Sequence, residues 1–167
     1  MRVLGIDPGS HVTGWGVVEA VGSRMLHVAS GVIRAPQEVL VARLLSIADA
    51  LDALLAEHQP QAVSVETIFH SVNAQSAIKL GQARGAALLC AGRFGAPVFE
   101  YTAGQIKQAV TGRGRAEKAQ VQTMIRLLLG LSEAMPFDAS DALAAAMCHA
   151  QMHGTPAAQW LRQEGKR

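Results

Sequence analysis

The sequence of 167 residues has few aromatic side chains, few charged ones and almost no cysteine. Aromatic residues make up only 4%, so any core must be built mainly from Ala, Leu, Val and Ile. The two cysteines, Cys90 and Cys148, lie in Ala- and Leu-rich stretches and form no C-x-x-C pair. This excludes a disulfide or cysteine–zinc framework and predicts two reduced core thiols. With 50% hydrophobic and 17% charged residues, the composition also excludes an intrinsically disordered chain.

The sequence also lacks any long hydrophobic run that would indicate a targeting signal or a membrane span. It reaches a carboxylate at Asp7, too early for the apolar region of a signal peptide. The longest uncharged run, residues 142–161, is interrupted by His, Gln, Gly and Pro. We therefore expect a cytoplasmic protein without a membrane partner, of a length that corresponds to one domain.

Charge is distributed unevenly along the chain, although the net charge is only +2. Residues 71–126 contain eight Lys or Arg and two Glu, whereas residues 1–70 contain four basic and seven acidic residues. A basic middle beside an acidic segment is typical of a surface for a polyanion next to a carboxylate site. Solvated helix faces that happen to be basic would give the same pattern, so charge alone leaves both interpretations open.

Hydrophobic periodicity and turn signals predict an α/β domain. Strands are expected at residues 2–6, 12–21, 24–33, 62–66 and 97–101, and helices at 38–58, 73–93, 102–110, 116–129 and 136–153. Short turns between the first three strands predict an antiparallel meander, and the helix before the fourth strand predicts that it lies parallel to the first. The result is a five-stranded mixed sheet flanked by helices in residues 1–153, with residues 154–167 expected to form a flexible tail.

Four acidic residues occupy positions suited to a site. Asp7 and Glu66 end the first and fourth expected strands, at the sheet edge where open α/β folds build their sites. Asp138 and Asp141 lie three residues apart at the start of the last helix. Clustered carboxylates repel one another and need a proton or a cation, and an all-oxygen cluster suits Mg²⁺ or Mn²⁺. Two such ions can activate a water and stabilise the departing oxygen of a phosphodiester.

Each acid also has a simpler explanation. Asp138 and Asp141 resemble an N-cap with an acidic third position, which a helix dipole favours. Asp7 before Pro-Gly resembles an ordinary turn aspartate. Glu66 is harder to explain in this way, because it follows a run of Val and Ala and would be poorly solvated without a partner.

The motifs resemble, in order and over nearly the whole chain, those of the RuvC-type Holliday-junction resolvases, which have a ribonuclease-H-like fold. The blocks that carry the resemblance are G-I-D-P-G-S at 5–10, T-G-W-G-V-V at 13–18, V-E-T-I-F at 65–69, A-I-K-L-G-Q-A-R-G at 77–85, Q-I-K-Q-A-V-T-G-R-G-R-A-E-K at 105–118 and D-A-S-D-A-L-A at 138–144. The resemblance implies that Asp7, Glu66, Asp138 and Asp141 are the catalytic acids and hold Mg²⁺, two ions per site, with Mn²⁺ able to substitute. Family members differ at the position of Asp138, some having His there.

The resemblance also implies contacts with DNA. Lys118, as a catalytic residue, and Lys107 match basic residues near the scissile phosphate, and Phe69 matches an aromatic residue that stacks on an unpaired base. Arg84, Arg113 and Arg115 are expected to contact phosphates, the last two from a glycine-rich loop.

Outside these motifs, two features allow more than one interpretation. His149 and His153 lie four apart on a helix but lack the third ligand of a zinc site, so we interpret them as surface or capping residues. Ala77, Gly81 and Gly85 form a small-residue face, for packing within the chain or for a partner helix in a homodimer.

The sequence thus predicts a metal-dependent endonuclease that cuts four-way DNA junctions symmetrically in recombination and repair, as a homodimer, alongside a branch-migration complex with a junction-binding subunit and a motor ATPase. Two other functions remain open at this point. G-I-D-P-G-S also resembles the phosphate loop of actin- and sugar-kinase-type ATPases, and a binding protein could keep the fold without the chemistry. ATP binding by the chain would favour the first alternative, and junction binding without cutting the second.

Overall fold

A computed structural model describes residues 1–67 and 74–154 of the chain. The strands are β1 (Arg2–Asp7), β2 (Val12–Val21), β3 (Arg24–Arg34), β4 (Ala62–Glu66) and β5 (Val98–Tyr101), and the helices are α1 (Leu40–His58), α2 (Ala74–Phe94), α3 (Ala103–Thr111), α4 (Lys118–Leu129) and α5 (Phe137–Gly154). Every boundary lies within two residues of its predicted position. The expected tail coincides, apart from the last residue of α5, with residues 155–167, which lie outside the described residues.

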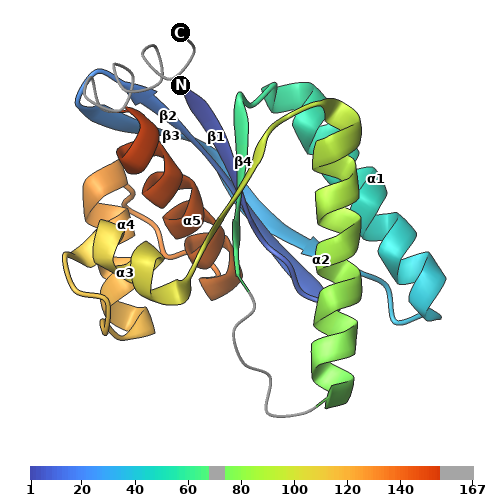
Figure 1. Ribbon diagram of the computed structural model, residues 1–167. Coiled ribbons are helices and arrows are strands. Elements are labelled where there is room, and N and C mark those ends of the chain that lie inside the picture. The colour runs from blue at the N-terminus through green and yellow to red at the C-terminus, as the bar shows by residue number, and fades with distance from the viewer. Residues whose placement is uncertain (68–73, 155–167) are drawn as a thin grey trace, which may run out of the picture.

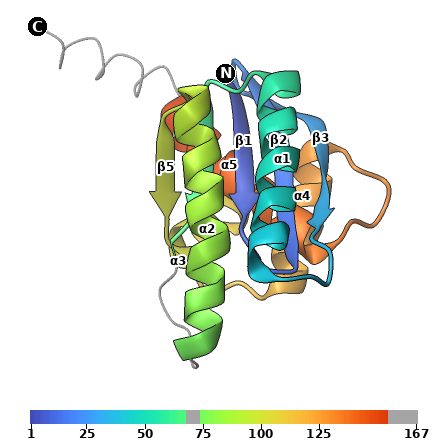
Figure 2. The ribbon, with the colours of Figure 1, turned by 90° about the vertical axis from the view of Figure 1, so that its right-hand side faces the viewer.

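The five strands form one mixed sheet in the order β3-β2-β1-β4-β5. The meander β1-β2-β3 is antiparallel and β4 pairs in parallel with β1, as predicted. In addition, β4 pairs in parallel with β5. The carboxyl ends of β1, β4 and β5 therefore meet at one edge of the sheet, together with the start of β2, the end of β3 and the start of α1 (Figure 2). We call this the carboxyl edge.

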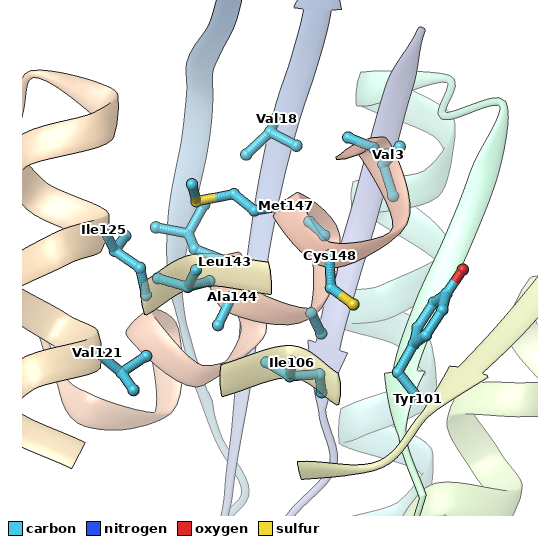
Figure 3. Close-up of a cluster of buried hydrophobic side chains, with 14 of the residues drawn as sticks. Val3, Val18, Tyr101, Ile106, Val121, Ile125, Leu143, Ala144, Met147 and Cys148 are labelled. Carbon is cyan, nitrogen blue, oxygen red and sulfur yellow. The ribbon is translucent and has the colours of Figure 1, made fainter. Parts of the chain in front are cut away.

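Helices cover the sheet in two layers, with α1 and α2 on one face and α3, α4 and α5 on the other (Figure 1). Side chains alternate between these faces along each strand. In β1, Val3 belongs to the core beneath α5 (Figure 3), whereas Leu4 and Ile6 belong to the core beneath α1 and α2. This alternation turns Gly5 and Asp7 toward the α5 layer.

Glycines in the sheet allow the backbone of α5 to lie unusually close to it. A Cβ atom at Gly5 would collide with the carbonyl oxygen of Ala142, and one at Gly14 would collide with the carbonyl oxygen of Asp138. A Cβ at Gly16 would lie 2.6 Å from Cγ of Leu143. Since any larger residue at these three positions would push α5 away, the glycines fix how near its first turns come to the end of β1.

Hydrogen bonds fasten α5 to the sheet at two further points. The hydroxyl of Ser64 in β4 donates to the carbonyl oxygen of Ala145 over 2.7 Å. The hydroxyl of Tyr101 lies 2.7 Å from Nδ1 of His149, whose ring is buried with its centroid 4.2 Å from that of Phe99. The prediction that His149 lies at the surface or caps the helix is therefore wrong, because aromatic residues of β5 enclose it.

The α1–α2 layer packs less completely. Ile47, Leu51 and Leu55 form the buried side of α1, whereas Val41 and Leu45 are 66% and 57% exposed. The apolar spacing in the sequence predicts one helix face made of Val41, Leu44, Leu45, Ala48, Leu51, Leu54 and Leu55, and this prediction is wrong for Val41 and Leu45. Cys90 and Cys148 are both buried and free, as expected. None of the helices in the described ranges is long and apolar enough to cross a membrane.

Candidate active site

A cavity of about 230 Å³ opens at the carboxyl edge, between the end of the sheet and helices α3, α4 and α5. Its polar lining comes from five separate elements, β1, β4, α3, α4 and α5, which supply Asp7, Glu66, Lys107, Lys118 and Asp141 respectively. Ile106, Val121 and Ala144 supply apolar walls. Five of the residues predicted from sequence thus share one concave site.

Asp7 is the last residue of β1 and faces this cavity rather than the turn that follows it. The side-chain hydrogen bonds of this turn come from Thr13, which is fully buried. Its hydroxyl donates to the carbonyl oxygen of Gly9 over 2.9 Å and accepts from the Gly9 N–H over 3.3 Å. The interpretation of Asp7 as an ordinary turn aspartate is therefore wrong, because Thr13 performs that role.

Burial raises the pKa of Asp7 to about 7, and the negative charges of Asp141, Glu66 and Asp138 add to the shift. Lys118 acts in the opposite direction without cancelling it. At neutral pH the carboxyl group of Asp7 therefore exchanges its proton readily, and an additional positive charge in the cavity would favour its ionised form.

Glu66 enters the cavity from the end of β4. Its neighbour Thr67 extends the pairing with β5, since its N–H and its hydroxyl both donate to the carbonyl oxygen of Tyr101, over 2.8 and 3.2 Å. Burial and the charge of Asp141 raise the pKa of Glu66, while Lys118 and Lys107 lower it. The carboxyl groups at the ends of β1 and β4 therefore both have a raised pKa in this negatively charged cavity.

Asp141 and Lys118 form the ion pair of the site, with Nζ 3.0 Å from Oδ2. Lys118 is the first residue of α4, and its pKa is raised by this hydrogen bond. Asp138 lies one turn before Asp141, inside the first turn of α5, so it is not the helix N-cap. It is close enough to raise the pKa of Asp7 but does not line the cavity.

The other predicted DNA contacts lie in different surroundings. Arg113 and Arg115 are exposed in the loop between α3 and α4. Arg84, by contrast, is mostly buried on α2, where Nη2 lies 2.6 Å from Oε2 of Glu100. The cavity does not include Arg84, and its charge is already neutralised, so its assignment to the DNA surface loses its basis. Phe69 lies outside the described residues.

The donor set of the cavity fits a hard divalent cation. Three carboxylates and no His or Cys line it, and hard cations such as Mg²⁺ prefer oxygen. No three His, Cys, Asp or Glu side chains of the described residues form a compact group around one point. In magnesium sites, one or two carboxylates commonly bind the ion, and water and substrate phosphate complete its shell.

The sequence analysis missed the residues that hold the acids in position. These are Gly5, Gly14 and Gly16 beneath α5, Thr13 in the turn after Asp7, and Ser64 beside Glu66. Glycines at every second position of a predicted strand were the available signal, since they indicate close approach of another backbone.

Comparisons with known proteins agree with this geometry. A family model described as crossover junction endodeoxyribonuclease RuvC matches residues 3–149. The crossover junction endodeoxyribonuclease RuvC of Pelobacter propionicus is 56% identical over 154 residues, which cover 92% of this chain and 88% of the relative. That of Alkalilimnicola ehrlichii is 53% identical over 164 residues, 98% of each chain.

Solved structures extend the similarity to three dimensions. A structure of Thermus thermophilus RuvC in complex with Holliday junction substrate matches with a TM-score of 0.85 and 40% identity, covering 90% of this chain and 93% of that one. The yeast mitochondrial Holliday junction resolvase Ydc2 matches with a TM-score of 0.62 at 11% identity over 96% of this chain and 85% of its own, a similarity of fold alone. The ribonuclease-H-like fold class expected from the sequence is thus confirmed.

Proposed function

This chain belongs to the RuvC family of crossover junction endodeoxyribonucleases and is a nuclease that resolves Holliday junctions, and we propose how its cavity performs the cut. The observation that carries the proposal is the shared cavity of Asp7, Glu66, Asp141, Lys107 and Lys118 at the carboxyl edge. Family membership favours this function over an actin- or kinase-type ATPase and over an inactive binding protein.

We propose that Asp7, Glu66 and Asp141 hold Mg²⁺, two ions per site, with Mn²⁺ able to substitute. When bound, these ions would activate a water and stabilise the oxygen that leaves the phosphorus. The carboxyl group of Asp7 gives up its proton on ion binding, because a cation opposes the charge repulsion that raises its pKa. Asp138 contributes negative charge from one helical turn away, and whether it is a ligand remains a prediction.

Lys118 and Lys107 approach the cavity from α4 and α3 and act on the phosphate. The ammonium of Lys118, which donates to Asp141, is positioned to donate instead to a scissile phosphate as negative charge develops there. In-line attack by water would leave a 5′-phosphate and a 3′-hydroxyl. Arg113 and Arg115 are exposed beside these lysines and would bind the backbone that continues from the cut. Base stacking by Phe69 also remains a prediction.

Two symmetric cuts require two sites, and we propose that a homodimer supplies them through α1 and α2. Val41, Leu45 and Leu89 are 66%, 57% and 69% exposed and surround a groove of about 570 Å³. Among the described residues, a Cβ at Gly81 or Gly85 would meet nothing within 4 Å, so these two positions leave room for a partner. An exposed apolar face of this kind typically marks a protein interface. The branch-migration complex and a cytoplasmic location also belong to the proposal.

The direct test is a gel assay with a labelled mobile four-way junction and a linear duplex of matched sequence, each with Mg²⁺ or with chelator. We expect paired nicks confined to the junction and dependent on the metal. Junction binding without cutting, in Mg²⁺ and in Mn²⁺, would contradict the mechanism and favour the binding-protein alternative. Indifference to both DNAs combined with ATP binding would favour the ATPase.

A further inference from the structure

We propose that a second basic cluster, His11, Arg34, Arg43 and Lys79, binds the phosphate backbone of the DNA arm that continues from the active site toward α1 and α2. The inference rests on the proposed function and extends its substrate contacts to the side of Asp7 opposite to Lys107, Arg113 and Arg115. Of its four residues only Lys79 belongs to one of the motifs that carry the resemblance, and none of the four was predicted to contact DNA.

Contacts between neighbours bring the four residues together, although they come from four segments. The N–H of Ala35, directly after Arg34, donates to the carbonyl oxygen of His11 over 3.0 Å, and Val12 pairs with Arg34 across β2 and β3. Nη1 of Arg43 lies 3.2 Å from Nε2 of His11. Arg43 and Lys79 line the same surface pocket of about 330 Å³ between α1 and α2. Arg43 therefore links His11 to the pocket that it shares with Lys79, and Arg34 adjoins His11 through the backbone.

Its charges are not neutralised within the described parts of the chain. No carboxylate there forms an ion pair with Arg34, Arg43 or Lys79. Three arginines elsewhere do have such partners, Arg2 with Glu19, Arg84 with Glu100 and Arg93 with Asp52. Cations left without a carboxylate and gathered on one edge form the electrostatic footprint of a polyanion site.

The local donors point to an anion in particular. Within residues 1–67 and 74–154, Arg43 has no acceptor other than the imidazole of His11, and its buried Nε has no hydrogen-bond partner. A guanidinium can only donate, so phosphate oxygens would satisfy it better than an imidazole nitrogen does. The N-terminus of α1 lies at the same edge, and it has neither a side-chain cap nor an acidic residue in its first turn. Its dipole therefore adds to the attraction.

The distance from the catalytic acid suits a flanking stretch of backbone. His11 follows Asp7 by four positions, so their Cα atoms lie at most about 14 Å apart. This corresponds to roughly four base pairs along a duplex. Guanidinium and ammonium groups at an exposed edge typically contact phosphates rather than bases. The cluster would thus hold a duplex arm in position without reading its sequence.

The test measures the salt dependence of binding to a four-way junction by fluorescence anisotropy, in chelator so that no strand is cut. The variants are Arg43→Gln, Lys79→Gln and the double variant, with Arg24→Gln as matched control. Arg24 is exposed at the opposite end of the β2–β3 hairpin and also lacks an ion pair in the described residues. Each lost phosphate contact should reduce the slope of log K against log salt by about 0.9. Arg24→Gln should give the same slope as the unmodified chain.

Slopes equal to that of Arg24→Gln would overturn the inference. A change of oligomeric state in Arg43→Gln or Lys79→Gln, measured by analytical ultracentrifugation, would overturn it as well, because the cluster would then belong to a protein interface. Failure of the proposed function is distinguishable, since the unmodified chain would then not cut the junction in the parallel Mg²⁺ assay, whether or not it binds.

A second measurement locates the contact on the DNA. Single phosphates within about four nucleotides of the cut are replaced by neutral methylphosphonates. This range of positions follows from the largest possible distance between Asp7 and His11. At the contacted phosphate, the replacement should weaken binding of the unmodified chain and of Arg24→Gln but not weaken Arg43→Gln further. Additive losses at every phosphate would show that Arg43 contacts none of them.

Discussion

The two helical layers cover the same sheet in opposite ways. On one face, α5 lies directly against Gly5, Gly14 and Gly16, and its alanines are almost completely buried. On the other face, α1 and α2 rest on larger side chains of the sheet, such as Leu4 and Ile6, and leave aliphatic residues exposed. The carboxylates of the cavity either belong to α5, as Asp141 does, or face the α3–α5 layer from the strand ends, as Asp7 and Glu66 do.

This difference shows how one sheet serves chemistry on one side and assembly on the other. A catalytic group on a helix must be held to a fraction of an ångström, and backbone packed against backbone provides that rigidity. An interface instead needs apolar side chains that a folded monomer leaves uncovered. The following predictions test this division.

The largest effect is expected from removing the carboxylate of Asp7, which faces the α3–α5 layer from the end of β1. Asp7→Asn should reduce the rate of junction cutting by about 10³-fold or more, because the ion site loses a ligand. Junction binding in Mg²⁺ should persist, since phosphate contacts supply the affinity. Single-turnover cutting and anisotropy on the same preparation measure both. Asp49→Asn, an exposed acid on α1, is the control, and normal cutting by Asp7→Asn would refute the assignment.

Next in size is the effect of separating α5 from the sheet. Gly5→Ala should destabilise the fold by about 1–3 kcal/mol, because the added methyl group meets the backbone of Ala142. If the fold survives, the displaced carboxylates should reduce cutting by about 10²-fold. Urea unfolding and cutting rates provide the readouts.

The control for this change is Gly92→Ala in α2, where a Cβ would meet nothing within 4 Å. It should be neutral or stabilise by roughly 0.5–1 kcal/mol, because alanine favours a helix over glycine. Equal stabilities for Gly5→Ala and Gly92→Ala would contradict the close packing of α5.

Leu45→Glu tests the exposed apolar face of the α1–α2 layer. A buried charge at the interface should dissociate the dimer, so that ultracentrifugation gives a monomer. On a supercoiled plasmid with an extruded cruciform, linear product from paired cuts should fall by about tenfold, by analogy with the loss of an interface hot spot. Leu127→Glu on α4, where the leucine is 70% exposed, is the matched control. A dimeric Leu45→Glu would show that the interface lies elsewhere.

The smallest effect concerns stability as a function of pH. The pKa of Asp7 is about 7 in the fold and 3.8 as the ordinary value, so the folded chain keeps a proton that the unfolded chain loses between these values. This contribution is complete below the lower value and disappears as the pH rises through the higher one. In chelator, stability should therefore fall by roughly 1–3 kcal/mol from pH 5 to pH 8. The raised pKa of Glu66 acts in the same direction.

Calorimetry at pH 5, 6.5 and 8 measures this fall. Mg²⁺ should raise Tm more at pH 8 than at pH 5, because ion and proton compete for the same carboxylates. In Asp7→Asn the fall should be smaller. A flat profile for the unmodified chain would contradict the charge repulsion in the cavity.

Much of the fold could be predicted because local signals agree along the sequence. Gly22-Ser23 marks the hairpin between β2 and β3, Pro60 ends α1, and Gly130 follows α4. Asp7 and Glu66 were identifiable because each ends an apolar strand, and parallel strands end at the same sheet edge. The helix α5 was expected from the start signals Pro136 and Asp138, although nothing local revealed which strand it approaches.

The remainder depends on contacts between distant segments. The sequence places Arg84 in a basic stretch, but only the fold shows Glu100 beside it. Likewise, Arg34 and Arg43 belong to the acidic N-terminal part of the sequence, and only the meeting of β3 with α1 brings them to His11. The distribution of charge along the sequence therefore indicated the basic surface near Lys107 and Arg113 and missed the cluster around His11 and Arg43.

The most direct test of the central claim is to locate the ions in crystals grown with Mn²⁺, by anomalous scattering. The account predicts anomalous peaks between Asp7, Glu66 and Asp141 in the unmodified chain, and their loss in Asp7→Asn. Peaks bound elsewhere, or peaks that persist unchanged in Asp7→Asn, would contradict the claim that the glycine-packed face of the sheet builds the metal site.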